Sequence, residues 1–523
     1  MSAGIRHGLR RGFDYAERAL DYLFGPAWNP LGQLGALGWF LFWIVAISGI
    51  YLFVFFDTGV VNAYASVEWL THDQWFHAGV ARSFHRYASD LLVAVMLLHL
   101  VREFAYDRYR GVRWFSWFTG LPLVWFVYVS GITGYWLVWD KLAQYIAVLS
   151  SELLDWLPIF GEPIARNFLT PESLSGRFFT LMVFLHIAVP LILLLVMWIH
   201  IQRISRAKVN PPRALGAMVM GGLLAVSLVM PATSQGPADL AQVPVAIGID
   251  WFYLPLYPLA DQVPAGVIWG GLALFTLALG VLPWLPPLRA PRAAEVFLDQ
   301  CNGCGRCVED CPYEAITLAP RSDGAPFSEE AVVNPERCVA CGICMGACPS
   351  SSPFRRSQEL VTGIDLPDFP LRDLRAQVIA AAAALEGRVR IVTLACAHGA
   401  AAKVRGAVVL PCVAMAPPSL IDFIVSRRLA EGVAIAGCAE RGCQNRLGVE
   451  WTKQRLAGAR DPYLRARVPR ARIATLWAGP TEDARLAREY AAFEAALLLL
   501  PANRAQQRRS ASPAQPSPET IRS

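Results

Sequence analysis

Long apolar runs dominate the first 290 residues of this chain, whereas shorter apolar stretches alternate with polar ones in the remainder. Five of the long runs contain no charged residue, and a sixth contains charged residues and two histidines. Each run supplies most of the ~20 residues that a helix needs to cross a bilayer. We therefore predict six transmembrane helices, at Leu31–Phe56, Phe84–Val101, Phe115–Trp139, Phe178–Ile201, Ala214–Ala238 and Val263–Leu288.

The charges along the chain predict how these helices are oriented. Only 17% of the 523 residues are charged, below the roughly 25% of an ordinary globular protein. Lys and Arg gather before the first predicted helix and in alternate loops, and these are expected on the cytoplasmic side. We expect a multi-pass protein of the bacterial inner membrane, with both termini in the cytoplasm and no cleaved signal peptide. The net charge of +6 forms no basic stripe, so no nucleic-acid partner is expected.

Four histidines lie inside the predicted helices, in two pairs with the spacing H-x13-H. Fourteen residues span roughly 21 Å of helix and return to nearly the same face. The second and fourth helices both run inward, so His85 is expected near His186 at the outer side, and His99 near His200 at the inner side. Neutral imidazoles are haem ligands, and polar groups in lipid are usually functional. The pattern predicts two b-type haems; the alternative is four structural histidines.

Further motifs around these histidines resemble the cytochrome b of bc-type and b6f-type complexes, over about residues 25–285. In that family, paired glycines make room for the porphyrins, and arginines near the histidines contact the haem propionates. The resemblance assigns the first role to Gly35, Gly49, Gly120 and Gly134, and the second to Arg82 and Arg102.

The chain departs from that family at the outer quinol site. The family's Pro-Glu-Trp-Tyr segment is replaced by Ile249-Asp250-Trp251-Phe252, and no Rieske-type Cys/His pair follows. A bifurcating quinol cycle at the outer face is therefore not expected. Asp250 and Asp90 are candidates for proton or quinone chemistry, with a solvated surface group or a snorkelling side chain as the alternatives.

All 12 cysteines follow residue 300, in spacings typical of metal sites rather than disulfides, so we place this half in the cytosol. Eight of them form two C-x2-C-x2-C-x3-C-P runs, which resemble dicluster ferredoxins over about residues 293–352. The fourth Cys of such a run ligates the other cluster, and Gly303, Gly305 and Gly342 permit the turns. Structural zinc is the alternative. The predicted ligand sets of the two 4Fe-4S clusters are Cys301, Cys304, Cys307 and Cys348 for the first, and Cys338, Cys341, Cys344 and Cys311 for the second.

The last four cysteines lie in a region where short apolar strands alternate with helices, which predicts a small parallel α/β domain. Three of these cysteines follow strands, at the edge where such folds bind ligands. Four thiolates suit a 2Fe-2S cluster, whereas buried free cysteines are the alternative. The candidate ligands are Cys396, Cys412, Cys438 and Cys443.

This region, about residues 388–480, resembles the delta subunit of methyl-viologen-reducing hydrogenase. The resemblance rests on Gly437-Cys438 followed by Cys443; the family's usual Cys-x2-Cys is reduced here to Cys396. It implies an iron–sulfur domain that docks a cytoplasmic flavoprotein or dehydrogenase, of the heterodisulfide reductase type for example.

Taken together, the patterns predict a multidomain fold: an all-α, six-helix transmembrane bundle, a ferredoxin-like α+β dicluster module and a small parallel α/β domain. The expected boundaries are 1–292, 293–355, a linker at 356–387, 388–500, and a disordered tail at 501–523. The predicted function is electron transfer between a cytoplasmic partner, the clusters, the haems and the quinone pool. The alternative is a conduit without its own quinone site, leading to a periplasmic carrier.

Overall fold

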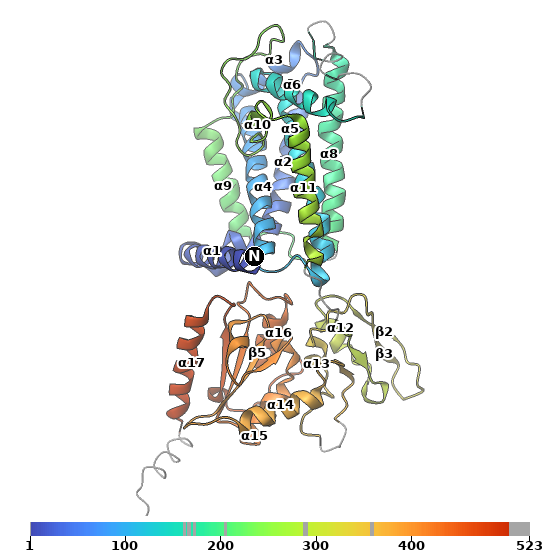
Figure 1. The fold of residues 1–523 in the computed structure, drawn as a ribbon, viewed down its shortest axis with the longest axis vertical. Helices are drawn as coiled ribbons and strands as arrows, with labels where there is room; N and C mark the ends of the chain where they lie inside the picture. Colours follow the sequence, from blue (N-terminus) through green and yellow to red (C-terminus); the bar gives the residue numbers. More distant parts are fainter. Residues whose placement is uncertain are drawn as a thin grey trace, which may run out of the picture. The chain divides into compact units, whose positions relative to one another are not determined.

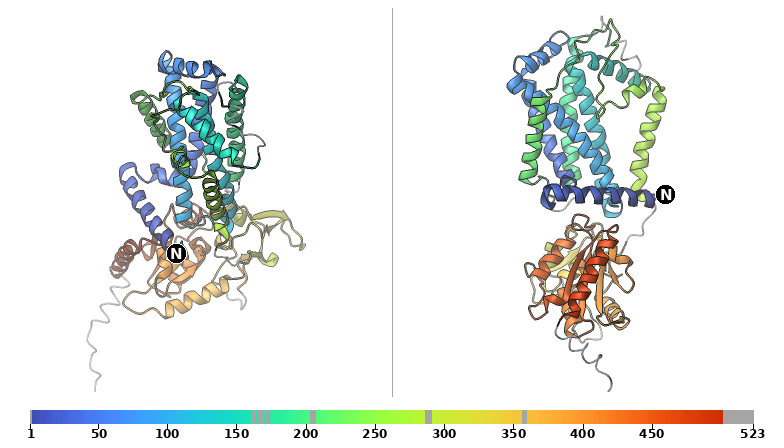
Figure 2. Two further views of the ribbon diagram at one scale, coloured as in Figure 1. Left: turned by 45° about the horizontal axis from the view of Figure 1, so that its top comes forward. Right: turned by 90° about the vertical axis from the view of Figure 1, so that its left-hand side faces the viewer.

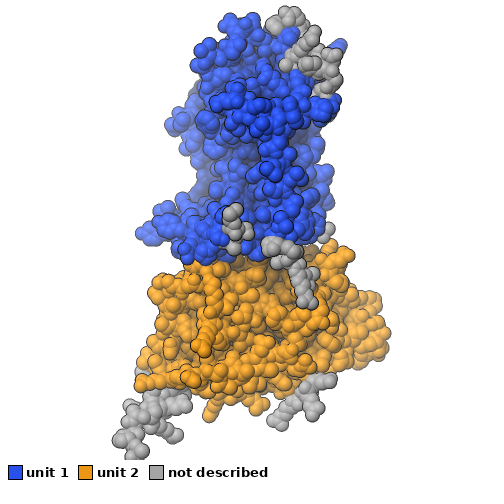
Figure 3. Space-filling view, viewed as in Figure 1, with its two compact units in different colours: residues 1–288 blue, residues 289–523 orange. Residues whose placement is uncertain are grey.

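The computed structural model describes residues 2–159, 164, 169–170, 174–202, 207–285, 291–355 and 360–500. The predicted tail at 501–523 lies outside these residues. The chain divides into two compact units, residues 1–288 and 289–523, which Figure 3 colours separately.

The first unit is helical (Figure 1). Helix α2 packs against α4, and α5 packs against α8, while α9 contacts α4 and α11 contacts α5. The long helices are α2 (Leu34–Phe55), α4 (Val80–Ala105), α5 (Trp114–Val138), α8 (Gly176–Gln202), α9 (Arg213–Val229) and α11 (Ala265–Val281).

Among the described residues, four helical segments are long and apolar enough to cross a membrane: Pro30–Phe55, Trp114–Val138, Phe179–Gln202 and Ala265–Trp284. Large apolar side chains stay exposed on them, such as Leu191 (63%) and Leu274 (71%), as expected for surfaces that face lipid. Helix α4 has the length but carries several charged side chains, and α9 has only 17 residues.

Two predicted helices end earlier than expected. The helix predicted to reach Ala238 ends at Val229, and the one predicted to reach Leu288 ends at Val281 and continues only as a 3-10 turn, Leu282–Trp284. Proline follows at Pro231 in the first case and lies within that turn, at Pro283, in the second. Because proline has no N–H and its ring clashes with the preceding turn, it ends a helix despite an uncharged sequence.

Among the described residues of this unit, three longer helices were not predicted, because they are amphipathic and too polar to cross a membrane, and neither was the four-residue helix α10 (Tyr257–Ala260). Helix α1 (Ser2–Phe24) lies across one end of the bundle, and α3 (Asn62–His72) and α6 (Lys141–Asp155) lie at the opposite end (Figures 1 and 2). Helix α1 buries Phe13 and Glu17 while Tyr22 stays 91% exposed. Its contacts with α4 therefore come from one face only.

The second unit begins with two short cysteine-rich halves. One contains α12 (Arg306–Asp310) and the other α13 (Ile343–Ala347). Between these helices, β2 (Ile316–Pro320) pairs antiparallel with β3 (Glu329–Val333). A further antiparallel pair joins β1 (Glu295–Val296) to β4 (Ile364–Asp365) and so closes the module at its ends.

A four-stranded, wholly parallel sheet follows, in the order β6-β5-β7-β8. The central strands β5 and β7 are buried along their whole length, as expected where helices cover both faces. The strands lie where the sequence predicted them: β5 (Ile391–Cys396), β6 (Val408–Leu410), β7 (Gly432–Gly437) and β8 (Ile473–Trp477). The helices of the domain that contains this sheet are α14 (Leu371–Ala383), α15 (Pro418–Ser426), α16 (Gly448–Ala457) and α17 (Asp483–Leu498).

The stretch expected to be a linker, 356–387, differs from that expectation. From residue 371 it forms α14, which contacts β5 and β6 and buries Leu371, Leu374 and Val378. The proline- and charge-rich composition before it concealed this apolar stripe, which repeats at helical spacing.

Candidate cofactor-binding sites

The first histidine pair joins α4 to α8. The ring centroids of His85 and His186 lie 6.2 Å apart, and the ring planes are inclined by 68°. A metal–imidazole bond of about 2 Å on each side, plus roughly 1 Å from each nitrogen to its ring centre, gives roughly 6 Å. The separation therefore fits one metal ion held between the two rings, as in a bis-histidine haem.

The second histidine pair, His99 and His200, lies one 14-residue step further along the same two helices. These side chains are close enough to interact electrostatically. Both pairs can meet only if α4 and α8 run in the same direction, with matching positions along their axes. The structure thus brings together both pairs that the spacing predicted.

The four predicted glycines lie directly against the four histidine rings. A Cβ atom at Gly49 would lie 2.9 Å from Cε1 of His85, and one at Gly134 would lie 2.8 Å from Cε1 of His186. The second pair is less crowded: the corresponding distances are 3.4 Å from Gly120 to His200 and 3.7 Å from Gly35 to His99. The resemblance assigned these glycines to the porphyrins; here their missing side chains leave room for the rings themselves.

Three of the four rings share a pattern of hydrogen bonds that the sequence analysis missed. In each, Nδ1 meets a backbone carbonyl four residues before the facing glycine and the hydroxyl of the residue just before it. Such contacts orient a histidine ligand and leave Nε2 as the metal-binding nitrogen. The contacts are Val45 O (2.9 Å) and Ser48 Oγ (3.2 Å) for His85, Ser130 O (3.0 Å) and Thr133 Oγ1 (3.2 Å) for His186, and Ser116 O and Thr119 Oγ1 (3.1 Å) for His200.

The fourth ring lacks this arrangement. Within the described part of the chain, His99 makes no such hydrogen bond, and Leu34 stands before its glycine. The sequence signal that could have predicted these hydrogen bonds is a Ser-Gly or Thr-Gly dipeptide, which occurs at three of the four glycines.

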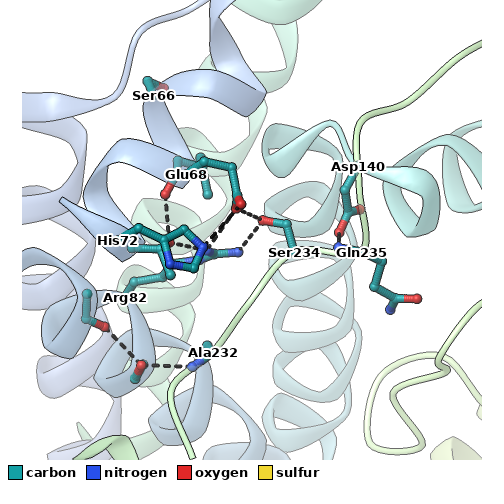
Figure 4. A network of polar contacts seen from close by, with 12 residues as sticks. Ser66, Glu68, His72, Arg82, Asp140, Ala232, Ser234 and Gln235 are labelled. Atoms are coloured by element: carbon teal, nitrogen blue, oxygen red, sulfur yellow. Dashed lines mark hydrogen bonds and ion pairs between the residues drawn. The ribbon is translucent and has the colours of Figure 1, made fainter. Parts of the chain in front are cut away.

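The two predicted propionate partners bind protein groups in this structure. Arg102 donates from Nε (3.0 Å) and Nη2 (2.7 Å) to Oε1 of Glu17, and this ion pair is buried where α1 meets α4. Arg82 donates to Thr71 and, at 2.9 Å, to Oγ of Ser234 (Figure 4). Neither guanidinium is free of protein partners.

Arg82 belongs to a polar network that ties the segment after α9 to α3 and α4 (Figure 4). Ser234 donates to Oε1 of Glu68 at 2.6 Å, and Nε2 of His72 lies 3.3 Å from the other carboxylate oxygen. Nearby, Gln235 N–H donates at 2.9 Å to Asp140, whose pKa is raised by burial. The network fixes the loop that leads towards Asp250.

The structure brings the two proton or quinone candidates together through Arg86, a residue to which the sequence analysis assigned no role. Nη2 of Arg86 lies 2.7 Å from Oδ2 of Asp250, and its Nη1 pairs with Asp90. Tyr135 donates its hydroxyl to Asp250, and the Arg86 guanidinium lies 5.1 Å from the centroid of that tyrosine ring. Asp250 is therefore a buried, paired carboxylate rather than a solvated one.

The predicted ligands of the first 4Fe-4S cluster converge, since Cys301, Cys304, Cys307 and Cys348 line one cavity. Gly303 (φ 66°) and Gly305 (φ 72°) take left-handed conformations, and a Cβ at Gly303 would lie 2.2 Å from a backbone oxygen. Burial, together with the neighbouring thiols of the same set, raises the pKa of Cys307 to about 12.

The predicted ligands of the second cluster also lie together: Cys344 is close enough to interact electrostatically with Cys341, Cys338 and Cys311. Ala340 (φ 53°) and Gly342 (φ 75°) repeat the left-handed backbone of the first half at equivalent positions. The fourth Cys of each run thus lies with the first three of the other, which is the exchange that two cubane clusters require.

The last four cysteines gather at one edge of the parallel sheet. Cys396 ends β5, Cys438 follows β7, and their sulfur atoms are 3.3 Å apart. Cys412 follows β6, and burial and the neighbouring Cys443 raise its pKa well above the usual value. All four side chains are buried.

Within the described residues, no group of three or more His, Cys, Asp or Glu side chains has the spacing of a single bound ion. Ligands of an iron–sulfur cluster bind different irons, so they need not share that spacing. Four cysteines gather at each of the three sites, and four thiolates are the usual ligand set of such a cluster.

The apolar helices, the facing histidines and the grouped thiols define a membrane-embedded electron-transfer protein. Residues 21–208 match the family Cytochrome b/b6/petB, and residues 300–352 match a 4Fe-4S dicluster domain. The chain thus joins a segment that matches the cytochrome b family, a match that implies haem b, to a segment whose match implies 4Fe-4S clusters.

The chain is also similar to two individual cytochromes b and to one solved structure. The chain is 24% identical over 300 residues to cytochrome b of Acanthamoeba castellanii, covering 51% of this chain and 76% of the relative. It is 25% identical over 347 residues to cytochrome b of Rhodospirillum rubrum, covering 58% and 82%. A chain of the solved hyperthermophilic respiratory complex III aligns with a TM-score of 0.38 and 22% identity, over 48% of this chain and 74% of that one.

Proposed function

We propose that this protein carries electrons between a cytoplasmic redox partner, its iron–sulfur clusters, two b haems and the quinone pool. The 6.2 Å separation of the His85 and His186 rings is the observation that carries the proposal, because it fits one iron between them. The matched second pair supports a second haem one step along the same helices. A haem, when bound, supplies one-electron chemistry, and the protein's part is to orient the four imidazoles.

The membrane arrangement that goes with this function has six spans, with α4 and α9 crossing beside the four apolar segments. The charged side chains Arg82, Arg86 and Asp90 of α4 gather near its first turns and are paired within the protein, which lowers the cost of placing them at the membrane edge. The basic loops support a cytoplasmic location of both termini, and the membrane we propose is the inner membrane of a bacterial cell.

On the cytoplasmic side, we assign two 4Fe-4S clusters to the two converging sets of thiols, and a 2Fe-2S cluster to the four cysteines at the sheet edge. The α/β domain would dock a flavoprotein or dehydrogenase subunit, in line with the resemblance to the hydrogenase delta subunit. The burial of all four thiols supports a bound cluster over a reactive surface site.

The quinone site is proposed beside the first histidine pair, where Arg86 holds Asp90 and Asp250. These carboxylates would accept the protons that accompany quinol oxidation. One observation favours the alternative function: Asp250 is already paired with Arg86 and Tyr135. A conduit that passes electrons to a periplasmic carrier needs no free carboxylate there.

A stoichiometric assay with quinol on the purified, haem-loaded protein separates the two functions. The quinone-linked function predicts haem reduction by quinol, inhibition by a quinone-site inhibitor, and at least tenfold slower reduction in Asp250→Asn. The control is Asp73→Asn, which changes an exposed carboxylate. Haem reduction only through a periplasmic carrier, with no effect of Asp250→Asn, would establish the conduit instead.

A further inference from the structure

A fully buried arginine lies between the second set of thiols in the dicluster module and the four cysteines of the α/β domain. Arg455 of α16 is 2% exposed. Its Nη1 donates to the carbonyl of Ala414 at 2.8 Å, and its Nη2 lies 3.4 Å from the carbonyl of Ile343. Ala414 follows Cys412 by two residues, and Ile343 directly precedes Cys344. One guanidinium thus holds two cysteine-bearing loops.

These two loops are in direct contact. Ile343, Cys412, Ala414 and Trp451 form one apolar cluster, against which Cys341 packs. A Cβ at Gly346 would lie 2.0 Å from the carbonyl oxygen of Ala414, so the two backbones approach as closely as they do only because a glycine stands there. No other residue layer separates Cys412 from the loop of the second cluster.

The charges at this contact do not cancel. Asp310, the residue before Cys311, pairs with both Arg455 and Arg460, and its side chain is 3% exposed. Two guanidinium groups against one carboxylate leave a net charge of +1 beside the two sets of thiols. Nε of Arg455 is buried without a hydrogen-bond partner among the described residues. A group that only tied two loops together would carry no need for an unbalanced, incompletely satisfied cation.

We propose that the C-terminal cysteine centre exchanges electrons directly with the second 4Fe-4S cluster across the Ile343–Cys412 contact, and that Arg455 holds this contact and sets both reduction potentials. The inference rests on the clusters assigned under the proposed function. One electron leaves one centre and reduces the other, with no bond or proton transferred. A buried positive charge stabilises the reduced, more negative state of each neighbouring centre. Arg455 is thus a positioning residue that also tunes the pair.

The test is a redox titration of the full-length, cluster-loaded protein, monitored by electron paramagnetic resonance. Arg455→Met is expected to lower the midpoint potentials of the second 4Fe-4S cluster and of the C-terminal centre. The equilibrium constant for reduction of each centre should fall at least tenfold, which corresponds to about 59 mV for a one-electron reduction. The reduction equilibrium constant of the first cluster should change less than threefold. Arg455→Lys keeps the positive charge, so the reduction equilibrium constants of all three centres should stay within threefold of the wild-type values.

Two further variants separate a tuning role from a structural one. Arg460→Met removes the other, more exposed partner of Asp310 and should have a smaller effect than Arg455→Met. Asp310→Asn leaves both cations unopposed and should raise the same two potentials, so the shift has the opposite sign. A purely structural role of Arg455 would not shift the potentials in opposite directions in these two variants. Asp310→Asn also keeps the test decisive if Arg455→Met fails to assemble.

Magnetic coupling tests the direct exchange. When both centres are reduced, the spectrum of the second cluster should show a splitting that Cys412→Ser removes and Cys304→Ser leaves in place. Unchanged potentials in Arg455→Met, or equal shifts at all three centres, would overturn the role of Arg455. If the wild-type protein shows no third centre, the assignment of the C-terminal cluster fails, while the potential of the second cluster still reports on Arg455.

Discussion

The two units of this molecule build their redox sites in opposite ways. In the membrane unit, each ligand stands on a long helix, and three of the four are oriented by hydrogen bonds from a facing helix: α2 for His85, and α5 for His186 and His200. His99 only faces Gly35 of α2. In the dicluster module of the C-terminal unit, the ligands stand on short loops and five-residue helices, and glycines of the same run, such as Gly303 and Gly342, set the backbone shape. A helix-borne site therefore depends on packing, whereas a loop-borne site depends mostly on local backbone conformation.

This difference has a consequence for mutations. In the membrane unit, a change far from a ligand in sequence, such as at a facing glycine, should act as strongly as a change in the ligand's own helix. In the dicluster module, the distant influence comes mainly from the fourth Cys of each run and from the contact around Arg455. Four substitutions test this contrast.

The largest effect is expected from a ligand in the membrane unit. His186→Leu should halve the haem content, because one imidazole of the first histidine pair is lost and a bis-histidine haem needs both. Haem per protein can be measured from the pyridine haemochrome spectrum. The control, His72→Leu, changes an exposed histidine outside both pairs. A full haem content in His186→Leu would refute the pairing.

The corresponding substitution in the dicluster module changes a cysteine of one run and should affect the cluster held mainly by the other run. Cys348→Ser should remove the first cluster rather than the second, although Cys348 belongs to the second run, because its side chain lies with Cys301, Cys304 and Cys307. The loss is about four irons per protein, measured by iron analysis and by the spectrum of the reduced protein. Ser352→Ala, a nearby change that removes no thiol, serves as the control. Loss of the second cluster instead would contradict the exchange between the runs.

A facing glycine comes next. Gly134→Val should lower haem occupancy at the first pair at least tenfold, because even its Cβ would lie 2.8 Å from His186 and the ring would have to move. Gly270→Val is the matched control, since no atom lies within 4 Å of its Cβ position in another apolar helix. Occupancy can be followed by haem titration of the apoprotein. Equal occupancy in the two variants would mean that helix packing does not limit the site.

The smallest effect is expected from a hydroxyl beside a histidine. Thr133→Val removes the contact to Nδ1 of His186 at 3.2 Å and should weaken haem binding up to about tenfold, with a measurable shift of that haem's potential. Ser130→Ala provides a close control, because the carbonyl of Ser130, and not its hydroxyl, bonds the same nitrogen. A potentiometric titration that shifts equally in both variants would assign the effect to general disturbance of α5.

Much of this site architecture was predictable from local patterns. The H-x13-H spacing, the two cysteine runs and the cysteines after apolar strands each involve residues a few helical turns or less apart. Short apolar runs that alternate with helical stretches also predicted β5, β6, β7 and β8. The four apolar segments could be recognised because a helix in lipid needs a charge-free run.

Other features depend on residues that are distant in the chain, and only the folded structure decided them. The Arg86–Asp250 pair, the Arg102–Glu17 pair and the Arg455–Asp310 pair join residues 164, 85 and 145 positions apart. No local pattern indicates such a partner, because an ion pair is selected by burial and geometry after the elements have packed. The sequence by itself determined which residues are the candidate ligands of haem and clusters; tertiary packing decided what orients those residues and which buried charges surround them.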